Sequence, residues 1–303
     1  MQKVLDMSNT VNSFIQAKNP SPKVESLKSQ SCCAINMHEA KEPSCSFSPD
    51  VTSAHDLQEL RFFGGFSCVT NHNGVVQAHE LRDQAKELLA LISIQHDREI
   101  SREWISQVLW PSSNAKKPRQ SLYTLWSYMS RLFANDSGEI SWISKSRTSL
   151  KINSNNSFID LVALEYLCDE IMCGRLSDYV VVLDALKDLY RGELLPGFNN
   201  QEIVAARSMW KNKVTTVALV CAQNLVKDRD YHFALRFLEF AESVDPFNEQ
   251  VCYLQAQVLR KIHLHFRAME CISLFRKRAV SKYALEGSAR LTNLYEEILV
   301  EAQ

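Results

Sequence analysis

The hydrophobic pattern begins with a segment typical of paired strands. Apolar and aromatic side chains are dense in residues 61–70, around the pair Gly64-Gly65, and a polar turn at 71–74 separates them from a short apolar run at 75–78. Short apolar runs bounded by Gly and Asn are typical of antiparallel strands. We therefore expect a β-hairpin with a bulge or tight turn over residues 60–78.

Three segments with helical spacing of apolar residues follow. Residues 80–95 repeat Leu, Ala and Ile at intervals of three and four. A second helix is expected to start after Ser101, which suits an N-cap, and to stop at Trp110-Pro111. In the third helix, which ends with SLYTLWSYMSRLF (121–133), counting about 100° per residue gathers one apolar face. That face contains Leu122, Leu125, Trp126, Met129, Leu132 and Phe133.

A second hairpin is expected after the third helix. Residues 140–144 and 149–153 have strand character, and a turn at 145–148 joins them. Strands, three helices and a final hairpin form the element order of a winged helix. The pattern therefore predicts a winged helix-turn-helix domain over residues 58–156.

The rest of the chain, residues 157–303, is expected to be helical with an internal repeat. Four positions recur at a spacing of 34 residues, which is the period of tetratricopeptide (TPR) helix-turn-helix units. These pairs are Leu225 and Leu259, Tyr231 and His265, Ala234 and Ala268, and Phe240 and Leu274. The predicted fold class is mainly α with a small β component: a winged helix followed by an all-α TPR-like array.

Charge is uneven along the chain. Residues 58–156 contain 12 basic and 9 acidic side chains, whereas residues 157–303 contain 17 basic and 20 acidic ones. The middle part is thus the part suited to a polyanion.

Residues 1–57, rich in Ser, Asn, Lys and Pro, are expected to be a flexible leader with a short helix near residues 4–14. Apolar runs such as the one at 180–183 are far too short to span a membrane, so we expect no membrane partner.

The sequence shows no pattern of catalysis or metal binding. The nine cysteines form no CxxC pair and no Cys/His set at zinc spacing, and their odd number, without a secretory signal, favours reduced cytosolic thiols. Gly-rich phosphate loops, GxSxG and HExxH motifs are absent. We therefore expect no enzyme activity, no cofactor and no metal.

The polar face of the third helix is the candidate DNA-reading surface. Gln suits adenine, Arg suits guanine, and Thr or Tyr can contact base edges or phosphates. Basic residues at the helix start and on the second hairpin can hold phosphates. The predicted DNA-binding residues are Lys116, Lys117, Arg119, Gln120, Tyr123, Thr124, Ser127, Tyr128, Arg131, Lys145 and Arg147.

Several ordered motifs resemble one bacterial family. RFFGGF, ELRDQAKELLALI, REISREWISQVLWP and SLYTLWSYMSRL are similar to the OmpR-type winged helix of the SARP transcriptional activators. LYRGELLPGF (189–198) and the repeats after it resemble their bacterial transcriptional activator domain. The resemblance implies a bacterial cytoplasmic activator, associated with the nucleoid when bound, that binds double-stranded DNA. It also implies a homodimer on direct-repeat sites and contact with RNA polymerase.

A second function stays open beside this one. Family members carry arginines along the third helix where this chain has Tyr123, Tyr128 and Ser130. The alternative is therefore a TPR-like adaptor whose winged helix no longer binds DNA. In the array, partner contact is one interpretation of a set of mostly basic residues, and a solvated face with a buried tryptophan is the other. These residues are Arg207, Trp210, Lys211, Lys213, Arg229 and Arg236.

Overall fold

The computed structural model describes most of the chain after the leader. The described ranges are 58–70, 74–76, 79–96, 98–111, 118–134, 140–153, 157–284 and 288–302. The predicted leader at 1–57, with its short helix, lies outside them. In chain order the elements are β1 (Gln58–Arg61), β2 (Ser67–Thr70), β3 (Gly74–Val76), α2 (Asp83–Ile94), β4 (Ile100–Ser101), α3 (Arg102–Leu109), α4 (Pro118–Phe133), β5 (Ile143–Lys145), β6 (Ser149–Ile152), β7 (Ser157–Ile159), α5 (Asp160–Met172), α6 (Tyr179–Leu189), α7 (Gln201–Lys227), α8 (Tyr231–Val244), α9 (Glu249–Lys261), α10 (His265–Tyr283) and α11 (Ala289–Glu301).

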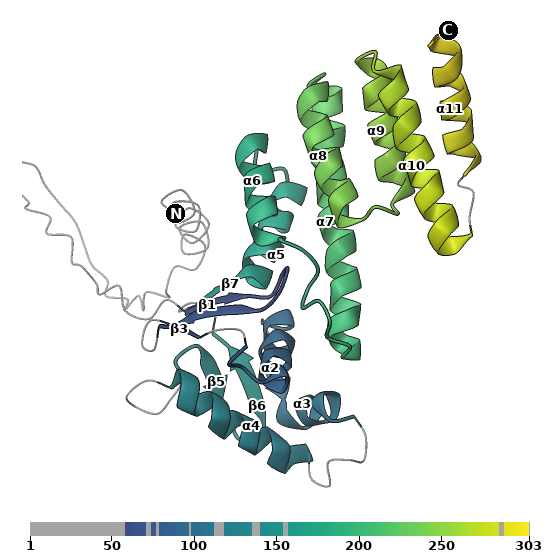
Figure 1. Cartoon of the computed structure of the whole chain (residues 1–303). Coiled ribbons are helices and arrows are strands. Elements are labelled where there is room, and N and C mark those ends of the chain that lie inside the picture. Colours follow the sequence, from purple (N-terminus) through teal and green to yellow (C-terminus); the bar gives the residue numbers. More distant parts are fainter. Residues whose placement is uncertain are drawn as a thin grey trace, which may run out of the picture.

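The three helices α2, α3 and α4 form a winged helix with a three-stranded sheet of order β4-β6-β5. Strands β5 and β6 pair antiparallel, with Lys145 opposite Leu150, as expected for the second hairpin. Ser101 caps α3 as predicted, because its side chain accepts a hydrogen bond from the Glu103 backbone N–H. The two-residue strand β4 was not expected from the sequence. In Figure 1 this unit occupies the lower part of the molecule.

A separate four-stranded sheet of order β3-β2-β1-β7 lies above the winged helix. The expected antiparallel pairing is present, since β2 pairs with both β1 and β3. The sequence did not indicate β7, which pairs parallel to β1 and immediately precedes α5. Segments almost 100 residues apart in the chain therefore meet in one sheet.

The side chain of Asp160 holds the end of this sheet. Asp160 is fully buried. Its carboxyl group accepts hydrogen bonds from the backbone N–H groups of Phe62 (2.7 Å), Phe63 (3.0 Å) and Leu161 (2.8 Å). Burial raises the pKa of Asp160 to about 7, although these three donors and Arg61 lower it. One side chain thus accepts hydrogen bonds from the two backbone N–H groups that follow β1 and from one at the start of α5.

The loop between α6 and α7 packs against the turn that follows β1. The Gly64 N–H donates to the Glu193 carbonyl (2.9 Å), and the Leu195 N–H donates to the Phe62 carbonyl (3.0 Å). Gly64 has φ +76°, and a Cβ there would lie 3.0 Å from the Arg191 carbonyl oxygen. The RFFGGF and LYRGELLPGF motifs therefore form one joint, in which two backbone segments approach closely.

Two residues of α7 complete this joint. The Arg207 guanidinium donates to the carbonyls of Leu194 (2.9 Å), Leu195 (2.6 Å) and Phe198 (3.0 Å). Trp210 is 3% exposed and packs edge-on against Phe63, with ring centroids 5.7 Å apart. The structure therefore gives both residues a role in packing rather than at a partner surface.

Three other basic residues of the predicted partner set also have neighbours within residues 157–303. Lys213 pairs with Glu165 (3.5 Å) and Asp169 (3.0 Å), and Lys211 pairs with Asp245 (3.3 Å). Arg236 lies over the Phe233 ring, and Arg229 occupies the turn before α8 with φ +63°.

The helices α7 to α11 form a stacked array with a repeated turn. The N–H of Asp230 donates to the Leu225 carbonyl (2.9 Å), and 34 residues later the N–H of Leu264 donates to the Leu259 carbonyl (2.9 Å). Arg229 and His263, one residue earlier in each turn, both have positive φ. The predicted period is therefore visible in the backbone itself. Among the described residues, no helix is long and apolar enough to cross a membrane.

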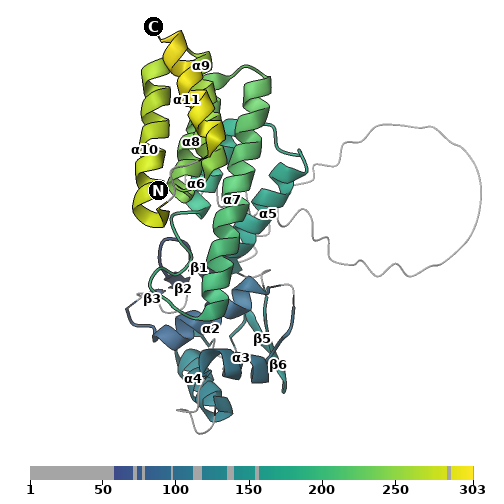
Figure 2. The ribbon, with the colours of Figure 1, turned by 90° about the vertical axis from the view of Figure 1, so that its right-hand side faces the viewer.

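Helix α7 joins the two parts of the molecule. Figure 1 and Figure 2 both show it running from the level of α2 up to α8 in the array. Near its start, the Asn200 side chain donates to the Val108 carbonyl at the end of α3 (3.2 Å). The winged helix and the array are thus connected by packing as well as by the chain.

Candidate nucleic-acid interface

Helix α4 has one buried face and one exposed face. Leu122, Leu125, Met129 and Phe133 are buried, and Trp126 and Leu132 are half-buried, so the predicted apolar face is the packed one. Pro118 starts the helix, where its missing N–H and fixed φ are tolerated. The packing therefore leaves the opposite side of α4 as the surface that a groove of DNA could meet.

The exposed face contains most of the predicted base-reading side chains. Gln120, Thr124 and Ser127 are exposed, and Tyr123 is 57% exposed. The Thr124 hydroxyl donates to the Gln120 carbonyl (3.0 Å), and the Ser127 hydroxyl donates to the Tyr123 carbonyl (3.0 Å). Both hydroxyl oxygens can still accept hydrogen bonds from outside.

Two other predicted residues of α4 lie nearer its C-terminal end. The exposed Arg131 donates from Nε to the Ser127 carbonyl (3.3 Å), which directs its guanidinium along the same face. Tyr128 is half-buried, and its hydroxyl donates to the Glu80 carbonyl (2.7 Å). Tyr128 therefore also fastens α4 to the segment that precedes α2.

Three arginines surround a cavity of about 200 Å³ at the other end of α4. Arg119 comes from the start of α4, Arg102 from the start of α3 and Arg147 from the turn between β5 and β6. The lining also contains the hydroxyl-bearing side chains of Ser101 and Thr148. A concave surface with three guanidinium groups and several hydroxyls offers the donors that bind a phosphate group.

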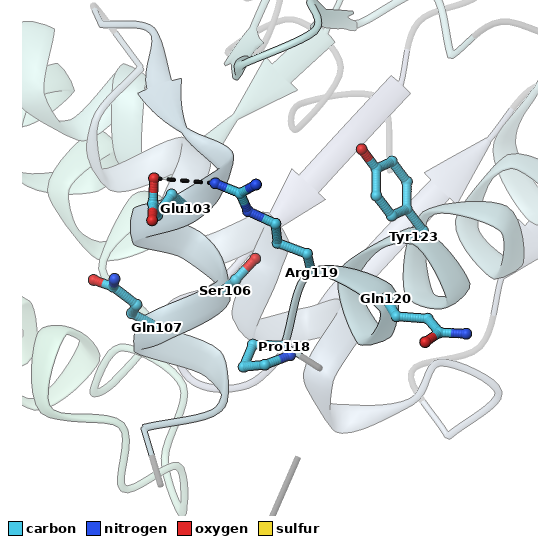
Figure 3. A pocket seen from close by; sticks show the side chains of 7 residues that line it. All are labelled: Glu103, Ser106, Gln107, Pro118, Arg119, Gln120 and Tyr123. Carbon is cyan, nitrogen blue, oxygen red and sulfur yellow. Dashed lines mark hydrogen bonds and ion pairs between the residues drawn. The ribbon is translucent and has the colours of Figure 1, made fainter. Parts of the chain in front are cut away.

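One carboxylate lies within this arginine group. Glu103 pairs with Arg119, with Oε2 and Nη2 3.3 Å apart. Both side chains are more than half exposed, so the pair is screened by water and adds little stability. Figure 3 shows this pair on the neighbouring hollow between α3 and α4, with Gln120 and Tyr123 projecting from α4 beside it. A phosphate could therefore displace Glu103 from Arg119 at low cost.

The hairpin of β5 and β6 is the wing of the winged helix, and its two predicted DNA-binding residues, Arg147 and Lys145, have different surroundings. Arg147 lies at the tip of a tight turn in which the Ser146 hydroxyl accepts from the N–H groups of Thr148 (3.2 Å) and Ser149 (2.9 Å). Lys145 lies with Nζ 4.9 Å from the centroid of the Trp126 ring. Partial burial, and secondarily the charge of Arg102, lower the pKa of Lys145.

The structure brings most of the predicted site residues onto one side of the winged helix, with some exceptions. Lys116 and Lys117 lie outside the described residues. Arg131 lies about 18 Å along α4 from Arg119, given the helical rise per residue, so these two arginines would meet different parts of a duplex. The described residues contain no group of three or more His, Cys, Asp or Glu side chains that could hold a metal ion.

Sequence reasoning missed Arg102 as a site residue. Its side chain donates to the Arg147 carbonyl (3.4 Å) and lies over the Tyr123 ring at 5.9 Å. The backbone contact that places it there joins the Arg102 N–H to the Thr148 carbonyl (2.8 Å). The position of Arg102, directly after the N-cap of α3, was a usable signal, because helix starts are common phosphate-binding positions.

The architecture defines a class of protein: a winged helix followed by an array of TPR-like helices, mainly α with a small β component. Among solved structures, a chain of Mycobacterium tuberculosis EmbR, in complex with a low affinity phosphopeptide, has a similar fold with a TM-score of 0.59. The two chains are 15% identical, and the match covers 82% of this chain and 66% of the EmbR chain, just under two thirds.

At this identity the structural likeness shows the fold alone. That fold is the one that the SARP resemblance implied. The sequence matches no protein-family model and no curated protein.

Proposed function

We propose that this protein is a sequence-specific, DNA-binding transcriptional regulator of the SARP type that acts in the bacterial cytoplasm as an activator. In this proposal α4 enters the major groove of double-stranded DNA, and the β5–β6 turn contacts the neighbouring backbone. The observation that supports it is the exposed polar face of α4, which the arginine group of Arg102, Arg119 and Arg147 adjoins at one end. The proposal assigns the protein no catalytic step and no cofactor.

The side chains on α4 suit the reading of base edges. Gln120 can pair with the N6 and N7 atoms of adenine, and Arg131 can pair with O6 and N7 of guanine. Tyr123, Thr124 and Ser127 offer hydroxyl groups between them on the same face. The chain departs from an arginine-rich recognition helix, so we expect recognition to depend on neutral hydrogen-bonding groups more than on charge.

The arginine group is assigned to backbone phosphate. Guanidinium groups bind phosphate oxygens through paired N–H donors, and such contacts fix the register of a protein on a duplex without reading sequence. Arg102, Arg119 and Arg147 come from three different elements of the winged helix. A phosphate bound among them would therefore align α3, α4 and the wing on the DNA together.

We also propose that the two parts of the chain have different roles. Residues 58–156 would bind DNA, and residues 157–303 would contact RNA polymerase or a second protomer on a direct-repeat site. The repeated turns of the array support an interaction role, because stacked helical repeats leave extended surfaces for partners. The joint at Gly64 and Arg207, together with the hydrogen bonds of Asp160 to Phe62 and Phe63, would keep the two parts in a fixed relation.

The proposal predicts DNA binding with a steep dependence on salt. In this proposal six basic residues face phosphate, while Arg131 is kept for guanine. If each of the six meets one phosphate, the slope of log affinity against log salt is about −5. They are Arg102 and the predicted residues Lys116, Lys117, Arg119, Lys145 and Arg147. Replacing Arg102, Arg119 and Arg147 together with alanine is expected to make this slope shallower by about 3 and to weaken binding to all duplexes alike. Fluorescence anisotropy of a random duplex pool, titrated from low to high salt, measures both quantities.

A charge-matched triple variant separates a local effect from a general one. Replacing Arg236, Arg267 and Lys277, which are exposed on α8 and α10, removes the same charge and should leave the slope unchanged. Loss of binding in both triple variants would point to unspecific attraction. A folded protein that binds no duplex at low salt would reject the regulator and favour the alternative, a TPR-like adaptor whose winged helix contacts protein.

A further inference from the structure

Two cysteines of the array lie side by side on neighbouring helices. Cys252 is in the first turn of α9, and Cys271 is in the middle of α10. Their sulfur atoms are 3.9 Å apart, and the Cys252 thiol also faces the Cys271 carbonyl at 3.9 Å. A disulfide has an S–S bond of about 2.05 Å. The two side chains therefore need to move together by only about 2 Å in total to form one.

The two thiols differ in their access to solvent. Cys271 is partly exposed, and its thiol also lies 3.4 Å from the Gln255 side-chain oxygen. Cys252 is 5% exposed. Cys271 is the more exposed residue of the pair, so we expect a small reagent to react there before it reaches Cys252. This arrangement of an accessible thiol and a buried thiol in contact suits an attacking cysteine and a resolving cysteine.

We propose that Cys252 and Cys271 form a redox-active dithiol, a modification site at which a low-molecular-weight disulfide cross-links α9 to α10. This assignment stands on the sulfur-sulfur contact and on the unequal exposure of the two residues. It does not depend on DNA binding. In a reducing compartment such a pair is a thiol pair at rest, and its disulfide is a transient, condition-dependent state.

The reaction proceeds by two thiol-disulfide exchanges. The Cys271 thiolate attacks one sulfur of the small disulfide, the S–S bond breaks, and one small thiolate leaves and takes up the proton released by Cys271. The Cys252 thiolate then attacks Cys271 Sγ in the mixed disulfide, and the second small thiolate leaves and is protonated in turn. Two protein thiols are oxidised to one disulfide, and one small disulfide is reduced to two thiols.

The first exchange prepares the second. The hydrogen bond with Cys271, followed by burial, raises the pKa of the Cys252 thiol well above its usual range. Once Cys271 is in a mixed disulfide, it no longer has a thiol to share in that hydrogen bond. Cys252 then loses its largest barrier to deprotonation next to the sulfur that it must attack.

The other described cysteines lack this combination of access and proximity. Cys168 and Cys221 are buried, and burial raises the pKa of each to about 12. Cys68 is buried as well. Cys173 is exposed, so it should form a mixed disulfide with the reagent and serve as a marker of reaction. The structure therefore predicts one intramolecular link within the described residues.

The test exposes the folded full-length protein to oxidised glutathione and then alkylates the remaining thiols. Site-resolved mass spectrometry is expected to find peptides containing Cys252 and Cys271 joined with the loss of two hydrogen atoms. Cys68, Cys168 and Cys221 should remain thiols until the protein is unfolded. Mixed disulfide at Cys271 without any link to Cys252, under conditions that modify Cys173, would overturn the proposal.

Two single variants test the assigned roles. In Cys252→Ser, Cys271 should accumulate as a glutathione mixed disulfide, because nothing resolves it. In Cys271→Ser, modification of Cys252 should be at least about 10-fold slower than in the wild type, since the accessible thiol is gone. Equal reactivity of Cys252 in the presence and absence of Cys271 would show that the two thiols act independently, and would equally reject the dithiol.

Discussion

Replacing Asp160 with alanine is expected to lower the free energy of unfolding by about 4 kcal/mol. The reason is that three backbone N–H groups, those of Phe62, Phe63 and Leu161, donate to this one buried carboxyl group. Each buried donor left without a partner costs about 1–3 kcal/mol, and alanine would leave all three unsatisfied. Urea unfolding followed by intrinsic tryptophan fluorescence measures the loss, because Trp210 packs on Phe63 beside this site.

Two further variants test whether the loss of stability comes from the burial of Asp160 and from its role as a hydrogen-bond acceptor. Asp178 caps α6 with the same chemistry, accepting from Val180 N–H (3.0 Å) and Val181 N–H (3.2 Å), but in an exposed setting. Asp178→Ala should cost only about 1 kcal/mol. Asp160→Asn keeps one acceptor oxygen and should fall between Asp160→Ala and the wild type. A cost for Asp160→Ala no larger than that for Asp178→Ala would contradict the assigned role.

The same residue should leave a signature in the pH dependence of stability. Burial raises the pKa of Asp160 to about 7 from its ordinary value of 3.8. Between these two values the folded protein keeps a proton that the unfolded chain has lost, so the contribution of Asp160 to stability falls as the pH rises. The free energy of unfolding of the wild type minus that of Asp160→Asn should therefore decrease from about pH 4 to about pH 7. A difference that rises over this window would refute the raised pKa.

The sequence predicted those elements whose signal comes from residues close together along the chain. Helical spacing of apolar residues located α2 and α4, and the burial of Leu122, Leu125 and Met129 followed the predicted face. The period of 34 residues was readable because each repeat uses the same turn. It was imperfect at one position, since Phe240 is buried whereas its counterpart Leu274 is 43% exposed.

The features that the sequence did not predict depend on contacts between distant segments. Strands β4 and β7 have two and three residues, too few to show an alternating pattern, and each exists because a remote strand pairs with it. Arg102 joined the candidate interface for the same reason, since the pairing of β4 with β6 brings Arg147 beside it. The spacing of apolar residues was enough to predict the polar face of α4. The arginine group could be identified only from the tertiary structure, because its members are far apart in the sequence.

The second large effect is expected at Gly64, where the turn between β1 and β2 meets the loop before α7. Gly64→Ala should lower the free energy of unfolding by about 3 kcal/mol. The backbone has φ +76°, which an L-residue adopts at a cost of about 1–2 kcal/mol. The added Cβ would also lie 3.0 Å from the Arg191 carbonyl oxygen, so the two backbones must separate and the Gly64–Glu193 hydrogen bond must lengthen.

Gly174 provides the control that separates the two costs. Its φ is +68°, close to that of Gly64, but a Cβ there would meet no atom within 4 Å. Gly174→Ala should therefore show the backbone cost alone, about 1–2 kcal/mol, in the same urea unfolding experiment. The excess loss in Gly64→Ala measures the close approach of the two loops. Equal losses of unfolding free energy in the two variants would mean that the two loops can move apart at no cost. The joint could not then fix the position of the winged helix relative to the array.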